Sequence, residues 1–334
     1  MKTQRIVNCW DYHHGQSTRI LVSGFPAVPG ETMQDKQDYF EANLDGLRAA
    51  LCREPRGHRN MLGAIITAPV NDDSLIGVLF TSPDGYFDMC GDSSFSLGAY
   101  LVDSGVVQFE DGEQTRKVLV DTVAGQIFLE LTSRDSELES VAIGNVPSRY
   151  LGTAEIKVDG FGPVTADLGY GGLVYAFVPA KTFGINSLQF TEISGDEQRR
   201  VIEAGTAFLA AAKRTDTVNP IELVVLTEET DDPAVSRVSN FYAPGTMGRT
   251  PSGTGLSARL AVEHGKGRLE VGQSFSQESA LGLQFHGVID DVVTGEEGEL
   301  AVIPRLTAKS YLMGISQIVF KEDDVFKDGF SIHG

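Results

Sequence analysis

The chain has 334 residues, of which 41% are hydrophobic and 22% charged, and its formal net charge is −19. The length suits two domains of ordinary size, each large enough to bury a core, and the composition is that of a globular protein. The negative charge argues against nucleic acid and against an anionic membrane surface as partners, since both attract basic proteins. The chain has no apolar run long enough to span a membrane and no N-terminal apolar stretch typical of a signal peptide, so we expect neither.

The cysteines give a second indication of where the protein resides. Cys9, Cys52 and Cys90 stand at no spacing typical of a disulfide framework or of a metal site. Unpaired cysteines are typical of a reducing compartment. We therefore expect a cytoplasmic protein without a bound metal.

The residues before position 90 predict short strands and one helix. Lys36–Arg53 has apolar residues at helical spacing. The loop Trp10–Thr18 contains His13 and His14, either of which is a candidate contact for a ligand. Alternation and β-branched content predict strands at Arg5–Cys9, Arg19–Val22, Met61–Thr67 and Leu75–Thr81.

The stretch Met89–Gly105 predicts a buried helix whose first turn holds a thiol. The residues after Ser96 are apolar nearly all round, which is typical of a helix inside a core. Asp92, Ser93 and Ser94 favour the cap and first turn. Cys90 then lies at the positive end of the helix dipole, which lowers the pKa of a thiol and stabilises a bound anion. A plain buried cysteine before a core helix is the alternative interpretation.

The second part of the chain repeats this pattern. Thr250–Gly265 is again a small, glycine-rich cap followed by an apolar helix, and Ser252 aligns with Cys90 at an offset of 162 residues. Two such loops half a chain apart indicate a duplicated domain with one cap from each half. Around them we expect a helix at Glu197–Ala212 and a strand at Gly171–Pro179 whose glycines let a ligand approach the backbone. Further strands are predicted at Val106–Gln108, Arg116–Thr122, Gly125–Thr132, Leu138–Ile143, Val164–Leu168, Ile221–Leu226, Gly267–Ser276 and Gly282–Val293.

These residues carry a family resemblance. The MCG of Met89–Gly91 and the RTPSGTG of Arg249–Gly255 resemble the two signatures of the proline racemase family, which includes hydroxyproline epimerases and trans-3-hydroxyproline dehydratases. Trp10–Arg19, Glu54–Pro69 and Tyr170–Pro179 resemble further segments of that family, so the resemblance covers nearly the whole chain.

The resemblance implies a fold and a domain division. The fold is that of diaminopimelate epimerase: an α/β (α+β) protein with two pseudo-symmetric domains, each a sheet wrapped around a central helix, and an active site between them. The N-terminal domain would comprise residues 1–146 with about 312–334 and carry Cys90. The C-terminal domain would comprise residues 147–311 and carry Ser252. Members are often dimeric, so a homodimer is also expected.

The implied chemistry is removal of the Cα proton of a proline-type amino acid without a cofactor. Cys90 would be the base, Ser252 would line the opposite face of the substrate, and the helix N-termini would stabilise the developing negative charge. Gly91, Asp92, Ser93, Gly253 and Thr254 would bind the substrate carboxylate and amine. A racemase needs a thiol on each face, whereas the family's dehydratases pair the first cysteine with a hydroxyl residue.

Three positions depart from the family pattern. Asp92 replaces a histidine, and its carboxylate opposes ionisation of Cys90 by like-charge repulsion. Gly248 replaces the aspartate that holds the substrate ammonium in the family. Asp92 either takes over that role or merely caps its helix, and a third alternative is a substrate that has no ammonium. The loop around His13 lacks an expected glutamate, which leaves the contact of His13 with substrate open.

Three functions remain in competition. The first is dehydration of trans-3-hydroxy-L-proline to pyrroline-2-carboxylate with Cys90 as base. The second is a proline racemase or 4-hydroxyproline 2-epimerase that uses Cys90 and Ser252. The third is a degenerate member that binds, or acts on, a different small ligand.

Overall fold

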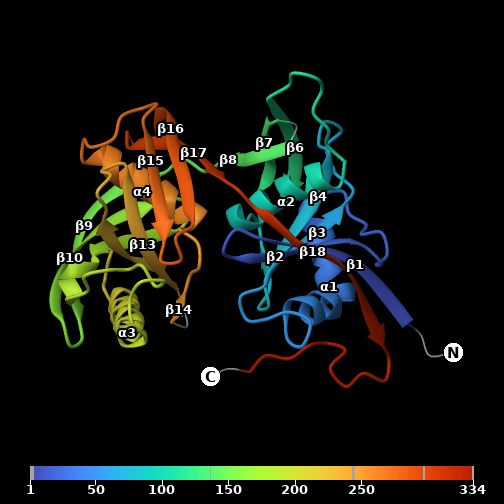
Figure 1. Ribbon diagram of the computed structural model, residues 1–334, viewed down its shortest axis with the longest axis horizontal. Coiled ribbons are helices and arrows are strands. Elements are labelled where there is room, and N and C mark those ends of the chain that lie inside the picture. The colour runs from blue at the N-terminus through green and yellow to red at the C-terminus, as the bar shows by residue number, and fades with distance from the viewer. Residues whose placement is uncertain (1–3, 136, 243–244, 296–297, 333–334) are drawn as a thin grey trace. The chain divides into compact units, whose positions relative to one another are not determined.

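The computed structural model describes residues 4–135, 137–242, 245–295 and 298–332. The chain divides into two compact units (Figure 1). Unit 1 contains the residues up to 143 together with those from 309 onward, and unit 2 contains residues 144–308. Within the described ranges, no helix is long and apolar enough to cross a membrane.

Unit 1 is a mixed sheet with two helices. Its strands pair in the order β18–β1–β2–β3–β4–β6–β7–β8, with the short β5 on β4. Figure 1 shows the red β18 beside the blue β1, so the end of the chain completes the sheet that its start begins. The bounds are β1 Gln4–His13, β2 Ser17–Ser23, α1 Met33–Cys52, β3 Leu62–Thr67, β4 Ile76–Thr81, β5 Tyr86–Phe87, α2 Gly91–Asp103, β6 Thr115–Thr122, β7 Gly125–Arg134, β8 Glu137–Gly144 and β18 Tyr311–Lys321.

Unit 2 repeats this architecture. Its strands pair in the order β9–β10–β11–β12–β13–β15–β16–β17, with the short β14 on β13. The bounds are β9 Arg149–Val158, β10 Gly162–Tyr170, β11 Val174–Pro179, the 3-10 turn η1 Ala180–Phe183, α3 Gly195–Ala212, β12 Leu223–Glu229, β13 Val235–Tyr242, β14 Thr246–Met247, α4 Gly253–Gly265, β15 Ser274–Ser279, β16 Gln284–Thr294 and β17 Leu300–Ala308.

The pairing sense along the two sheets is identical. Each runs antiparallel, antiparallel, parallel, antiparallel, parallel, antiparallel, antiparallel from its first strand, β18 or β9, to its last. The helices also occupy equivalent places. In the chain, α1 and α3 come after the third strand of each sheet, and α2 and α4 come directly after the short strand. The mixed α/β fold with two pseudo-symmetric halves, which the family resemblance implies, is confirmed.

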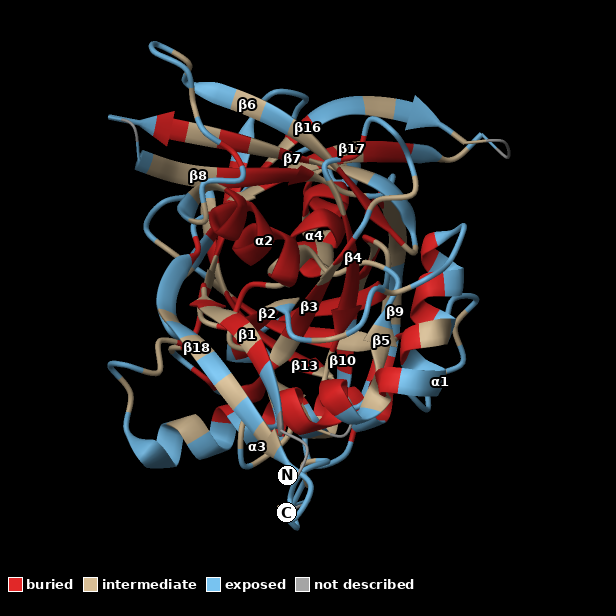
Figure 2. Cartoon of the chain, turned by 90° about the vertical axis from the view of Figure 1, so that its right-hand side faces the viewer, coloured by how far each residue is buried: buried red, intermediate tan, exposed pale blue. Residues whose placement is uncertain are grey.

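The central helices α2 and α4 are buried in their own units (Figure 2). Both have 13 residues and begin at the glycine after Cys90 or Ser252, as the 162-residue offset predicts. Small residues let the sheet approach them. A Cβ on Gly98 of α2 would lie 2.6 Å from the Val141 side chain, and one on Gly287 of β16 would lie 2.8 Å from Leu260 of α4.

The other two helices, α1 and α3, begin with complete capping boxes. Thr32 accepts a hydrogen bond from the backbone of Asp35, whose carboxylate accepts one from the backbone of Thr32. Ser194 and Glu197 form the same pair at the start of α3. Both pairs satisfy N–H groups that have no acceptor within the helix.

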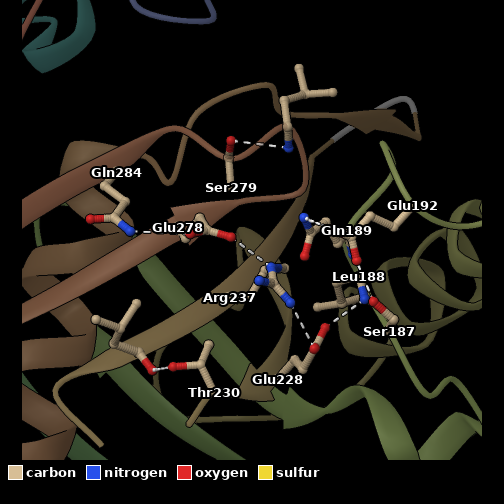
Figure 3. A network of polar contacts seen from close by, with 12 residues as sticks. Ser187, Leu188, Gln189, Glu192, Glu228, Thr230, Arg237, Glu278, Ser279 and Gln284 are labelled. Carbon is tan, nitrogen blue, oxygen red and sulfur yellow. Dashed lines mark hydrogen bonds and ion pairs between the residues drawn. The ribbon is translucent and has the colours of Figure 1, made fainter. Parts of the chain in front are cut away.

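A polar network holds three strands of unit 2 together (Figure 3). Arg237 of β13 lies between Glu228 of β12 and Glu278 of β15, with N–O distances of 2.8 and 2.7 Å. Glu228 also accepts a hydrogen bond from the backbone N–H of Leu188, at 2.5 Å. Every charged member therefore has a partner, which is what burial of charge requires, and we assign the network a structural role.

Three local predictions were wrong. The strand predicted at Gly267–Ser276 begins only at Ser274, because the residues before it form turns and irregular connections. Residues 106–108 form no strand, because they follow the C-terminus of α2 as a turn and an extended connection. The strand predicted at Gly171–Pro179 begins only at Val174, and Gly171 before it packs closely against α4. A Cβ on Gly171 would lie 2.3 Å from the carbonyl oxygen of Thr254 and 2.5 Å from the backbone nitrogen of Ala258, both in α4.

Candidate active site

Cys90 occupies the N-cap of α2 with extended backbone dihedral angles, φ −138° and ψ 109°. Cys90 is partly buried. Its backbone carbonyl oxygen accepts hydrogen bonds from the backbone N–H and the hydroxyl of Ser94, at 3.0 and 2.8 Å. The thiol makes no capping hydrogen bond. The Sγ atom is thus held beside the first N–H groups of the helix, where an anion is stabilised.

The pKa of the Cys90 thiol is raised to about 11, chiefly by burial and secondly by repulsion from the neighbouring Asp92 carboxylate. The hydroxyl and backbone N–H of Ser93 and the backbone N–H of Asp92 act in the opposite direction, because they hydrogen-bond to the thiolate. The helix terminus alone predicted a lowered pKa, but burial outweighs it. In the ligand-free protein at neutral pH the thiol is therefore protonated.

Asp92 is fixed by a buried histidine. His14 is 1% exposed, and its Nε2 lies 3.0 Å from Oδ1 of Asp92. On its other side, Nδ1 of His14 lies 3.4 Å from the hydroxyl of Ser96, which is 2.9 Å from that of Ser310. This chain of contacts ties the β1–β2 turn and the start of β18 to the first turn of α2.

The sequence alone selected the neighbouring residue, His13. The structure brings His14 to the first turn of α2, and His13 packs beside Tyr311, with 5.7 Å between ring centroids. The difference comes from a β-bulge in β1 between Asp11 and Tyr12, which shifts the alternation by one residue. Simple alternation from the buried Val7 and Cys9 points to position 13, whereas beyond the bulge the buried residues are Tyr12 and His14. Contact of His13 with a substrate stays a prediction.

Ser252 occupies the N-cap of α4 in an unusual backbone conformation. Its φ of 70° and ψ of 126° lie outside the regions that non-glycine residues normally adopt. Its Oγ accepts a hydrogen bond from the N–H of Gly255, at 3.2 Å, and its own N–H donates to the hydroxyl of Thr250, also at 3.2 Å. Such strain costs about 1–3 kcal/mol and clusters at functional sites, which supports Ser252 as a functional residue.

Three hydroxyl groups meet at this second cap. The Tyr175 hydroxyl lies 3.0 Å from Oγ of Ser252 and 2.7 Å from Oγ1 of Thr254, and the two smaller hydroxyls are 3.3 Å apart. Tyr175 comes from β11 and is 1% exposed. Gly255 leaves room for its ring, because a Cβ there would lie 3.3 Å from Cε1 of Tyr175. Sequence analysis missed Tyr175, since an aromatic residue in an apolar strand looks like core.

Gly248 is not required by packing. Its N–H donates to the carbonyl of Asn240, at 2.9 Å, and a Cβ at this position would meet only ordinary contacts, the nearest at 3.5 Å from Cβ of Asn240. A side chain could therefore begin here without strain. The absence of a carboxylate at position 248 is therefore not a steric necessity.

Each unit thus gathers its own part of the predicted site. In unit 1, α2 brings together Cys90, Gly91, Asp92 and Ser93, with His14 behind Asp92. In unit 2, α4 brings together Ser252, Gly253 and Thr254, with Tyr175 behind them. A cavity of about 1150 Å³ in unit 2 contains none of these residues and is lined instead by others that include Arg259, Glu263 and Lys266. Across the described residues, no three His, Cys, Asp or Glu side chains group as metal ligands would.

Comparison with known proteins shows to which family the chain is similar. The family model described as proline racemase matches residues 9–331. The proline racemase of Clostridioides difficile is 33% identical over 341 residues, which cover 99% of this chain and 99% of that protein. The trans-3-hydroxy-L-proline dehydratase of Colwellia psychrerythraea is 33% identical over 335 residues, covering 97% and 92%.

A solved structure is similar over the same extent. The crystal structure of a hydroxyproline epimerase from Agrobacterium vitis, with bound trans-4-hydroxy-L-proline, matches with a TM-score of 0.82 and 27% identity, covering 99% of this chain and 96% of that one. The chain belongs to the proline racemase family. It is an enzyme, either an isomerase or a lyase.

Proposed function

We propose that the protein dehydrates trans-3-hydroxy-L-proline to pyrroline-2-carboxylate, with Cys90 as the base and without a cofactor. The supporting observation is the set of partners around Ser252. In the part of the chain that the structure describes, its side chain contacts the hydroxyls of Tyr175 and Thr254 and the N–H of Gly255. None of these groups accepts a proton readily at neutral pH. A racemase needs a proton acceptor on both faces of Cα, whereas a dehydratase needs only one.

The stereochemistry of the substrate fits a single base. In trans-3-hydroxyproline the hydroxyl is trans to the carboxylate, so the hydroxyl and the Cα hydrogen lie on the same face of the ring. The Cys90 thiolate takes the Cα proton, and the C–H electrons form the C2=C3 bond as the C3–O bond breaks. The new S–H then gives its proton to the departing hydroxide. Water and a cyclic enamine result, and the thiolate is regenerated.

The remaining groups at the first cap bind the substrate. The N–H groups in the first turn of α2 have no acceptor within the helix and suit the carboxylate, whose negative charge grows as the carbanion develops. Asp92, held by His14, suits the ring ammonium. The ammonium would then offset the Asp92 charge that raises the pKa of Cys90, so that substrate binding itself favours the thiolate.

The experiment is proton NMR in deuterium oxide with trans-3-hydroxy-L-proline, both 4-hydroxyproline epimers and proline, each separately. We expect loss of trans-3-hydroxyproline with formation of the pyrroline product, and no conversion by Cys90→Ala. Deuterium at Cα with inversion of 4-hydroxyproline or proline would instead establish the epimerase and give Ser252 an acid–base role. No reaction with any of them would contradict both functions.

Two alternatives have specific support. The hydrogen bond between Tyr175 and Ser252 favours the epimerase, because it gives the serine a proton source. The raised pKa of Cys90, together with Asp92, Gly248 and Ser252 at positions that differ from the family pattern, favours a degenerate member that takes a different ligand. The cytoplasmic location and the homodimer stay predictions.

A further inference from the structure

The hydroxyl cluster at the second cap can release a proton but cannot readily take one. Tyr175, Ser252 and Thr254 each carry one hydroxyl hydrogen, and the three oxygens lie 2.7, 3.0 and 3.3 Å apart. Oγ of Ser252 already accepts the N–H of Gly255. A phenol is the most acidic of these groups, with an ordinary pKa of about 10. The chemistry of these groups thus suits proton donation rather than proton uptake, with Tyr175 as the most acidic member.

The dehydration proposed above leaves one step that needs such a donor. Its first product is an enamine, which becomes the imine only when C3 gains a proton and the nitrogen loses one. The Cys90 proton leaves with the water that departs from its own face of the ring. The proton for C3 therefore comes from another group of the protein or from solvent.

We propose that Tyr175, acting through Ser252, supplies the proton that converts the enamine to the imine before release. The inference rests on the proposed dehydratase function. The C2=C3 electron pair takes the hydroxyl proton of Ser252 at C3, and the nitrogen lone pair forms the C=N bond. Ser252 takes the proton of Tyr175, and the nitrogen loses its own proton to solvent. Thr254 donates a hydrogen bond to the tyrosinate until solvent reprotonates it.

The geometry supports this assignment over a purely structural one. A buried tyrosine needs one partner for its hydroxyl, and Thr254 at 2.7 Å already provides it. Because a phenol hydroxyl can accept one hydrogen bond and donate another, its second contact, to Ser252 in a strained backbone conformation at the start of α4, allows Tyr175 to donate a proton to that serine. Tyr175 is therefore a positioning and proton-supplying residue behind Ser252.

The test follows the product rather than the overall rate. The enamine, whose nitrogen conjugates through the double bond with the carboxylate, absorbs at longer wavelength than the imine and has a vinylic proton at C3. Stopped-flow absorbance and quenched proton NMR would follow both species with the wild type, Tyr175→Phe, Ser252→Ala and the control Tyr150→Phe. Tyr150 is partly buried in the same apolar cluster as Tyr175, so its variant removes a hydroxyl without touching the cap.

We expect the wild type and Tyr150→Phe to release the imine with no enamine phase. Tyr175→Phe and Ser252→Ala should accumulate enamine, because loss of one general acid slows its step by about 10²–10⁴-fold. Should Tyr175→Phe not fold, Thr254→Val tests the same relay, since it removes the group that stabilises the tyrosinate.

Two failures are distinguishable. If the wild type consumes trans-3-hydroxyproline but releases enamine, which then converts at the rate measured after the enzyme is filtered off, the relay is wrong and the dehydratase stands. The relay is equally wrong if Tyr175→Phe gives the wild-type time course. If the wild type does not consume the substrate at all, the dehydratase function fails and the relay fails with it.

Discussion

Oδ1 of Asp92 lies 3.0 Å from Nε2 of the buried His14. The pair places a carboxylate two residues after Cys90, in the first turn of α2, and holds it in one orientation. The carboxylate contributes to the raised pKa of the thiol after burial, which is the larger cause. Asp92 thus opposes ionisation of Cys90 in the free protein, and in the function we propose it also binds the substrate ammonium.

We predict that Asp92→Asn weakens substrate binding. Loss of a hydrogen-bonded, partly buried charge pair with the ammonium should cost about 1.5–3 kcal/mol, which is a roughly ten- to hundredfold rise in Kd. His14→Gln should have a smaller effect in the same direction, because it leaves the carboxylate but loosens its position. Calorimetry with proline as a non-reacting ligand measures both. Unchanged affinity in Asp92→Asn would contradict the idea that Asp92 replaces the family's aspartate at position 248.

We predict that Cys90 reacts slowly with iodoacetamide at neutral pH. A pKa of about 11 leaves about one thiol in 10⁴ ionised at pH 7. The labelling rate should therefore rise about tenfold per pH unit until it levels off near pH 11. In Asp92→Asn the plateau should begin at lower pH, because one of the two causes of the raised pKa is removed.

The measurement uses a Cys9→Ala, Cys52→Ala background, so that labelling reports one thiol. Because both replaced cysteines are buried, the thermal stability of the double variant would be checked first. A labelling rate that is already maximal at pH 7 would show that the helix terminus dominates over burial. An unshifted plateau in Asp92→Asn would show that burial alone sets the pKa.

The two repeated helix caps could be predicted from the sequence, whereas the hydrogen-bond partners of the candidate site could not. Cys90 and Ser252 could be aligned because a cap followed by an apolar helix leaves a local pattern. His14 could not be chosen over His13, since one bulge in β1 decides which of two neighbours faces inward. Tyr175 could not be found, because its hydroxyl meets Ser252 across 77 residues of chain. Local patterns predict elements, whereas the contacts that complete a site come from tertiary packing.

We predict that Ser252→Gly stabilises the protein while disabling the second cap. Glycine adopts a φ of 70° without steric cost, so the substitution should recover about 1–3 kcal/mol of backbone strain. Loss of the hydrogen bond from the serine side chain to the helix N-terminus should cost only a few tenths of a kcal/mol of this gain. Chemical denaturation would measure the free energy of unfolding, with Ser252→Ala as the control that removes the hydroxyl but keeps the strain. The prediction is wrong if the glycine variant is no more stable than the alanine variant.

We predict that Gly171→Ala destabilises unit 2 and displaces the second cap. A Cβ at this position would lie 2.3 Å from the carbonyl of Thr254 and 2.5 Å from the backbone nitrogen of Ala258, and neither can move without shifting α4. Asn145 adds a constraint, since its side-chain amide donates both to the carbonyl of Gly171, at 3.0 Å, and to the hydroxyl of Ser257, at 2.7 Å. The connection before β11 and the helix therefore cannot separate freely.

The expected loss for Gly171→Ala is about 1–3 kcal/mol of unfolding free energy, which corresponds to about 2–4 °C in Tm per kcal/mol for a unit of this size. Gly314→Ala is the matched control, because a Cβ there meets no atom within 4 Å, and it should leave Tm unchanged or slightly raised. Activity should fall further in Gly171→Ala than its stability explains, since Ser252 and Thr254 move with the start of α4. If the variant is as stable and as active as the control, the close contact between this glycine and α4 does not position the cap.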